Sequence, residues 1–366
     1  MNSRTSIVGH EVTSPTVLLG VLTVPPPRSL NLFALLITSF TLSACHRVHE
    51  PTTSGQPEAV VWPASPEVAR IAYVKSVVRP GDFGFRLSTF TRFGNWLAGT
   101  EKGNEPLLKP FGLALDENDN LCLTDTGANA VCYYDGAKRK WYRWTRVGRI
   151  TFSSPVAVAK RGNTLFVVDS ALGALVAFDA SNGKLLFRAT NHLERPSGLT
   201  LLNGQLLVAD SQRHRIIVFG LDGSFQREFG KRGVGHGEFN FPTHLAADSA
   251  NNLYVTDSMN SRIQVLDDNG VFKTELGSIG DSPGRFGRPK GVAVDPAGRV
   301  YAVDALFDNV QIFSPDGKLL LNWGETGAHP GEFWLANGIV INRKNEIFVA
   351  DSYNHRIQVF KYIGPS

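Results

Sequence analysis

The chain has 366 residues, of which 42% are hydrophobic and 19% charged, a globular composition that excludes a disordered chain. Its net charge of +4 is too small to indicate a nucleic-acid binder, and its three cysteines are too few to frame a disulfide-rich fold. The 36 glycines and 20 prolines indicate a protein with many turns.

Residues 1–44 have the pattern of an export signal. Residues 30–42 form an uncharged, mostly apolar stretch that follows Arg28. The stretch is too short to span a membrane, which takes about 20 residues, but it has the length of a secretory signal core, about 7–15 residues. The next residues, Leu42-Ser43-Ala44-Cys45, resemble the lipobox of bacterial lipoproteins.

The lipobox resemblance implies that Cys45 is acylated and becomes the new N-terminus. The protein would then be lipid-anchored to a membrane of the bacterial cell envelope, facing the periplasm or the exterior. The alternatives are an ordinary signal peptide beside an unmodified cysteine, or an uncleaved anchor. Residues 45–69, with four prolines among Thr, Ser and Gly, are expected to form a flexible tether.

A repeat accounts for the rest of the chain, residues 70–366. Short apolar runs end in an aspartate every 41–47 residues, at Asp125, Asp169, Asp210, Asp257, Asp304 and Asp351. Each run is preceded by a second repeated position, occupied by Pro110, Pro155, Pro196, Pro242, Pro289 and, in the sixth copy, Ala336. Such a period indicates a repeat architecture.

The fifth copy shows the content of one repeat. Residues 291–294, 300–303, 310–313 and 319–323 are short, β-branched runs, separated by the turn sequences Asp-Pro-Ala-Gly and Ser-Pro-Asp-Gly. The runs are too short for helices. Four strands in each of six copies predict an all-β, six-bladed β-propeller.

The sixth copy contains Asp351-Ser352-Tyr353-Asn354-His355-Arg356, which resembles the NHL repeat. The resemblance covers about residues 107–366 and implies an NHL-type propeller. The sixth copy lacks a fourth strand, so we expect the alternating segment at about residues 70–78 to close the ring as its outermost strand. Apolar residues spaced three and four apart predict a short helix at about residues 84–98, folded over one face.

The channel mouth is the expected place for chemistry, because the first strand of each blade lines the channel. The residues after the Pro column include one histidine, one lysine and one asparagine, His244, Lys290 and Asn337. These do not make a metal cage, so we expect no metal, no cofactor and no catalytic residue. A metal-dependent hydrolase or lyase, with further ligands from neighbouring loops, is the alternative.

The repeated aspartates are interpreted as structural groups that accept backbone N–H bonds in turns. Arg215, Arg262 and Arg356, five residues after an aspartate, are expected to pair with it or with the next blade. Cys122 and Cys132 lie on adjacent strands of one hairpin, where either a disulfide or two buried free thiols would fit.

The loops of one face carry the functional hypothesis. Exposed aromatic side chains with Arg and Met mark recognition surfaces. We therefore predict a monomeric binding platform for an envelope protein, a peptide or a small ligand. RNA binding is a third hypothesis, against which export and the low charge argue, so no nucleic-acid partner is expected. The candidate binding residues are Arg213, His214, His244, Met259, Asn260, Lys290, Phe307, Asp308, Trp334, Asn337, Tyr353 and Asn354.

Overall fold

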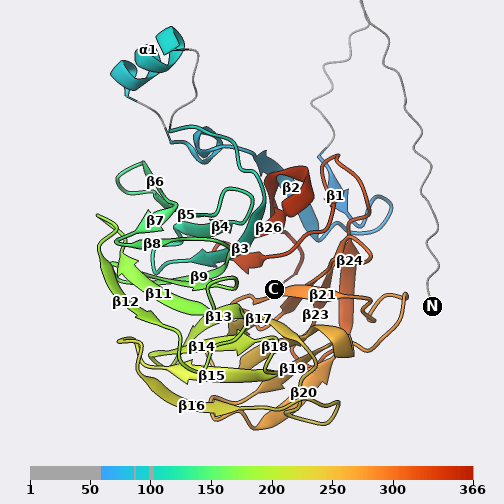
Figure 1. Ribbon diagram of the computed structural model, residues 1–366. Coiled ribbons are helices and arrows are strands. Elements are labelled where there is room, and N and C mark those ends of the chain that lie inside the picture. Colours follow the sequence, from blue (N-terminus) through green and yellow to red (C-terminus); the bar gives the residue numbers. More distant parts are fainter. Residues whose placement is uncertain (1–58, 86–87, 99–102, 366) are drawn as a thin grey trace, which may run out of the picture. The chain divides into compact units, whose positions relative to one another are not determined.

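Short β-branched segments, separated by turns of Gly, Asn and Asp, pair in antiparallel order into six sheets arranged around a channel (Figure 1). The computed structural model describes residues 59–85, 88–98 and 103–365. Within them the protein is the all-β, six-bladed propeller that the repeat predicts. The expected export signal and Cys45 lie outside the described residues, so both stay predictions.

Blades 1 to 5 each have four strands. The strands of blades 1 and 2 are β3 (Pro110–Leu115), β4 (Leu121–Asp125), β5 (Ala130–Asp135), β6 (Lys140–Trp144), β9 (Pro155–Arg161), β10 (Thr164–Asp169), β11 (Ala174–Asp179) and β12 (Leu185–Ala189). Those of blades 3 to 5 are β13 (Pro196–Leu202), β14 (Gln205–Asp210), β15 (Arg215–Phe219), β16 (Phe225–Phe229), β17 (Pro242–Ala247), β18 (Leu253–Asp257), β19 (Arg262–Leu266), β20 (Phe272–Leu276), β21 (Pro289–Val294), β22 (Val300–Asp304), β23 (Asn309–Phe313) and β24 (Leu319–Trp323).

Blade 6 joins the two ends of the described chain. It contains β25 (Ile339–Ile341), β26 (Glu346–Asp351), β27 (Arg356–Tyr362), β2 (Ile71–Val77) and β1 (Val61–Trp62). Strand β2 pairs antiparallel with β27, which confirms that the N-terminal segment closes the ring. It is not the outermost strand, however, because β1 pairs along its free edge. Trp62 packs edge-on against Phe360, with ring centroids 5.8 Å apart, and so anchors a segment that we expected to be tether.

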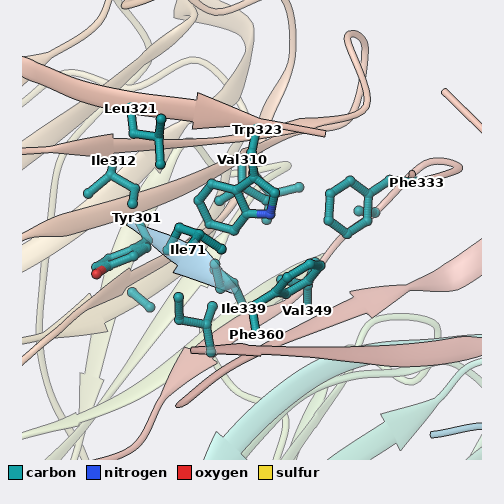
Figure 2. Packing of buried hydrophobic residues seen from close by; sticks show 14 residues of the cluster. Ile71, Tyr301, Val310, Ile312, Leu321, Trp323, Phe333, Ile339, Val349 and Phe360 are labelled. Carbon is teal, nitrogen blue, oxygen red and sulfur yellow. The ribbon is translucent and has the colours of Figure 1, made fainter. Parts of the chain in front are cut away.

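The core consists of buried apolar clusters between neighbouring blades. Figure 2 shows the cluster between blades 5 and 6, in which Trp323 and Phe360 lie within a set of 14 buried residues. Ile71 of β2 belongs to this set and is fully buried. Val77 of the same strand lies in the cluster between blades 6 and 1, so the closing strand adds to the core on both faces of blade 6 as well as to the sheet.

Smaller elements complete the described chain. They are the hairpin β7 (Arg146–Val147) and β8 (Ile150–Thr151), the 3-10 turns η1 (Pro80–Phe83), η2 (Ser258–Asn260) and η3 (Ser352–Asn354), and the helix α1 (Thr89–Ala98). The helix begins five residues later than the predicted start at 84, and its expected packing on one face stays a prediction. None of the described helices is long and apolar enough to span a membrane.

Cys122 and Cys132 do not form a disulfide; both are free and buried. The register explains why, because Cys122 lies opposite Tyr133 and Cys132 lies opposite Leu123. The two thiols thus point to opposite faces of the blade 1 sheet, one into the cluster with blade 2 and the other into the cluster with blade 6. Burial raises the pKa of both thiols, so neither is a ready nucleophile.

Candidate ligand-binding site at the channel mouth

The repeated aspartates hold the loops that lead to the channel. In blade 5, Asp304 accepts hydrogen bonds from the backbone N–H groups of Gly287 (2.6 Å), Arg288 (3.0 Å) and Leu306 (3.0 Å). Asp210 accepts bonds from the backbone of Glu194 and Arg195 in the same way. Both carboxylates are buried, and each fixes the residue just before the Pro column of its blade, Arg288 or Arg195, which lines the channel mouth.

The repeated arginines behave in two ways. Arg262 and Arg356 pair with Asp257 and Asp351 of their own blades, with Nε–Oδ2 distances of 3.0 and 2.7 Å. Arg215 instead pairs with Glu228 on the neighbouring strand. These arginines, like the aspartates, therefore form contacts within the protein and have a structural role.

In blades 1, 4 and 5, a β-bulge takes the two residues after the Pro column out of the regular ladder of the inner strand, whereas one residue is displaced in blades 2 and 3. In blade 5, Pro289 pairs with Asp304, but the next paired residue is Val292, so Lys290 and Gly291 lie outside the regular ladder. Blades 1 and 4 have the same irregularity after Pro110 and Pro242. Bulges of this kind re-aim side chains, and here they aim them at the channel.

The second residue after the Pro column sets the width of the channel. Four of the six positions are glycine, and at Gly291 an added Cβ would lie 2.3 Å from the carbonyl oxygen of Asn337. The inner strands are thus in backbone contact, and Gly291 N–H donates to that oxygen at 2.9 Å. At His244 the same position carries an imidazole, which stacks on Phe111 with centroids 6.0 Å apart. The ring fills the narrow channel and forms a floor.

Above this floor is a cavity of about 400 Å³ on the loop-bearing face. Its wall combines three cations, five hydroxyl groups and an apolar part, and no Asp or Glu occurs among the described residues that line it. The lining residues are Phe111, Val156, Ser170, Arg195, Ser197, Ser211, Phe241, Thr243, His244, Ser258, Met259, Arg288 and Lys290.

Burial and charge set the protonation of two cavity residues. Burial, together with the Arg288 charge, lowers the pKa of Lys290 to about 8. Burial and the Lys290 charge lower the pKa of His244 to about 3, so this imidazole is neutral at pH 7. Both of its nitrogens, and the hydroxyl of Thr243, are shielded from solvent and lack a hydrogen-bond partner among the described residues. Neutral His244 therefore offers one donor and one acceptor.

Three of the predicted binding residues, His244, Lys290 and Met259, meet in this cavity. Three asparagines instead stabilise loops through their Nδ2 atoms. Asn260 donates to Asp257 (2.8 Å), Asn354 to Asp351 (2.9 Å) and Asn337 to the Ser352 hydroxyl (3.0 Å).

Two further predicted residues accept hydrogen bonds from the next blade. His214 and Asp308 both occupy a left-handed backbone position four residues after a repeated aspartate. The backbone N–H of Phe241 donates to His214 Nδ1 (3.1 Å), and that of Leu335 donates to Asp308 Oδ1 (2.7 Å). These bonds hold neighbouring blades together.

Arg213 and Phe307 are not among the described residues that line the cavity. The backbone N–H of Arg213 donates to Asp210 at 3.1 Å, and the Phe307 ring lies close against Gly287.

Trp334 and Tyr353 form a separate surface cluster with Lys109. The two aromatic side chains belong to residues that are 52% and 39% exposed, and their ring centroids lie 5.6 Å apart. Lys109 Nζ lies 4.2 Å from the Tyr353 ring centroid and 3.1 Å from its hydroxyl. This cluster lies between blades 6 and 1. Most of the polar side chains that line the cavity belong instead to blades 3 to 5.

The sequence interpretation missed Arg195 and Arg288. Both stand immediately before the Pro column, at a position occupied by Lys109, Ser154 and Phe241 in other blades. A comparison of that column for charge would have shown its cationic members. The sequence alone could not show which of these cationic residues lie close together, because that depends on how the blades are arranged around the ring.

Among the described residues, no group of three His, Cys, Asp or Glu side chains could hold a metal ion. The cavity thus presents cations, an uncharged imidazole and an apolar surface to whatever enters it.

Two families match parts of the chain. The NHL repeat matches residues 333–360, and a family described as 6-bladed beta-propeller matches residues 184–253. Together with the six sheets around the channel, these matches identify the chain as a six-bladed β-propeller that carries the NHL repeat.

Solved structures with the same fold include two lyases and a binding protein. A streptogramin B lyase is 14% identical (TM-score 0.54, covering 70% of this chain and 95% of that chain). A virginiamycin B lyase from Staphylococcus aureus is 16% identical (0.52, 70% and 96%), and an auxiliary nutrient binding protein from Bacteroides thetaiotaomicron is 14% identical (0.55, 70% and 70%). At these identities the likeness shows the fold alone.

Proposed function

We propose that this protein is an exported, lipid-anchored binding protein whose propeller captures a ligand in the channel-mouth cavity. The cavity carries the proposal. Its volume of about 400 Å³ lies in the range of small-ligand pockets, about 300–1,000 Å³, and it combines an apolar wall with a few convergent polar groups. The His244 ring closes its floor, so that a ligand would be retained at the mouth.

Binding accounts for the wall better than catalysis does. A general acid or base needs a titratable group within reach of the ligand and with a pKa near the working pH. His244 has its pKa lowered to about 3, and the described lining contains no carboxylate. Lys290, with its pKa lowered to about 8 by burial, is the remaining titratable group of the described lining, and the charge that further lowers its pKa is that of another cation, Arg288. Such a wall attracts and orients a ligand.

The membrane anchor fits this role. The lipobox resemblance at Cys45 and the proline-containing segment after it would hold the propeller near a membrane while leaving its loop-bearing face accessible. A binding protein placed in this way can capture a solute, or a peptide end, that reaches the cell envelope.

A thermal-shift screen of the full-length protein against small molecules tests the proposal. Met259 is 57% exposed and lines the cavity, so Met259→Trp should obstruct the entrance and abolish the stabilisation given by a bound compound. Ile279→Trp is the matched control, since Ile279 is 75% exposed and is not among the described lining residues. Compounds that stabilise both variants as well as the parent protein would contradict the cavity as the binding site.

A further inference from the structure

The two ends of the channel differ in charge. The cavity at the opposite end, about 560 Å³, is lined by Asp119, Asp248 and Asp295 as well as by Lys160 and Arg343. Acidic and basic groups are therefore mixed there. At the loop-bearing end the described lining has Arg195, Arg288 and Lys290 and no acidic residue. The excess of positive charge is thus a property of one end and does not reflect the small net charge of the chain.

The charges of Arg288 and Lys290 are free to act on a ligand. The backbone N–H of Arg288 binds Asp304, and the backbone carbonyl of Lys290 accepts a bond from the Thr256 hydroxyl (2.7 Å). Within the part of the chain that the structure describes, no hydrogen bond or ion pair involves either side chain. Arg288 immediately precedes β21 and Lys290 is the second residue of that strand, and both residues line the same cavity.

Arg195 contributes less to this excess. It borders a neighbouring hollow as well, and the acidic residue Glu194 lines that hollow. Three of the cavity hydroxyls are already committed, since Ser197, Ser211 and Ser258 donate to the backbone carbonyls of Pro242, Arg195 and Pro289. The unbalanced polar groups of the wall are therefore chiefly the two cations of blade 5.

Another part of the wall is apolar and partly aromatic. Phe111, Val156, Phe241 and Met259 line the same cavity, and the Phe111 ring stacks on His244. Lys290 is partly buried and lies near the charge of the exposed Arg288, which is unfavourable unless an opposite charge balances the pair. A ligand that contacts both the two cations and the apolar part of the wall therefore needs an anionic group and an apolar body.

We propose that the cavity selects a small organic anion, with its carboxylate, phosphate or sulfonate group on Arg288 and Lys290 and its apolar body against Phe111, Phe241 and Met259. This inference rests on the proposed function, because it names the class of ligand that the channel-mouth cavity captures. The guanidinium of Arg288 suits bidentate contact with such an anion, and the Lys290 ammonium adds a point charge.

Two fluorescent probes of nearly equal shape separate charge from apolar contact. 8-Anilinonaphthalene-1-sulfonate is anionic, and N-phenyl-1-naphthylamine has the same rings without the sulfonate. The full-length protein is titrated with each probe, and so are its Arg288→Gln, Lys290→Gln and Lys109→Gln variants. Lys109 is the matched control, because it occupies the position of Arg288 in blade 1 but its Nζ is engaged by Tyr353. Equal thermal unfolding of all four proteins confirms that each is folded.

The inference predicts one sulfonate-probe site per protein, with affinity lowered about tenfold by Arg288→Gln and by Lys290→Gln and unchanged by Lys109→Gln. The neutral probe should bind more weakly and respond to none of the three substitutions. If both probes bind equally well, whatever the substitution, the ligand class is wrong and the proposed binding site stands. If neither probe binds, the proposed function is contradicted together with the inference.

Discussion

Asp351 shows how one buried side chain secures a whole repeat. Its carboxylate accepts hydrogen bonds from the Trp334 backbone (2.9 Å), from Arg356 Nε (2.7 Å) and from the amide groups of Asn354 (2.9 Å) and Gln358 (3.0 Å). Four donors from two separate segments of the chain thus converge on a fully buried anion. The repeated aspartate could be recognised from the sequence as structural, but the complete set of partners depends on the packing of the loop against the strand.

Asp351→Ala should destabilise the protein by about 3 kcal/mol, because it leaves the Arg356 guanidinium buried without its counter-charge. Asp316→Ala is the control, since Asp316 and Lys318 form an exposed ion pair whose loss should cost less than about 1 kcal/mol. Urea unfolding measures both differences. Equal losses of stability would show that the buried pair has no special role.

Lys290 predicts how ligand binding depends on pH. Its pKa is lowered to about 8 in the free protein, and a bound anion would raise it, so binding takes up a proton. The sulfonate probe should therefore bind with constant affinity between pH 6 and about pH 7 and progressively more weakly as the pH rises through 8. The pKa of His244, lowered to about 3, keeps this imidazole neutral throughout the range.

Titrations of the probe at several pH values test this assignment. Lys290→Gln should remove the decline between about pH 7 and 9 while leaving weaker binding at every pH. A decline that persists unchanged in the variant would mean that another group titrates.

At the scale of elements, the repeat gave four strands for each of blades 1 to 5 and a closing strand for blade 6, all of which the structure confirms. The period of two residues and the Gly-containing turns carry this information locally. The short strand β1 was missed, since two residues among prolines carry no periodic signal. Its place is decided by the packing of Trp62 on Phe360.

The closing strand predicts a sharp difference between adjacent valines. Val77, the last residue of β2, is fully buried, whereas Val78, just beyond the end of the strand, is 37% exposed. Val77→Asp places an unpaired carboxylate between blades 6 and 1 and should lower stability by more than about 3 kcal/mol, whereas Val78→Asp should change it by less than about 1 kcal/mol. Urea unfolding followed by circular dichroism compares them. Similar midpoints would contradict closure by β2.

At the scale of the molecule, the site is assembled from blades that are distant in the sequence. Its aromatic floor comes from Phe111 of blade 1 and His244 of blade 4, and its free cations come from blade 5. The sequence placed these residues in the correct repeat column, but only the curvature of the closed ring brings them together. The repeat pattern therefore could not predict the positive charge at one end of the channel.

The lipobox resemblance makes a prediction about the location of the whole molecule. Cys45→Ser removes the sulfur that would be acylated, so we expect the exported protein to move from the membrane fraction to the soluble fraction. Cell fractionation and immunoblotting follow this change. A variant that stays in the membrane fraction would contradict lipid anchoring at Cys45.

Hydrogen–deuterium exchange of the full-length protein, with and without bound sulfonate probe, tests most directly whether the channel mouth is the binding site. The account predicts slower exchange in the segments around Phe241, Met259 and Lys290 and unchanged exchange around Asp119 and Arg343 at the opposite end of the channel. Protection confined to the opposite end, or to the surface cluster of Trp334 and Tyr353, would contradict it.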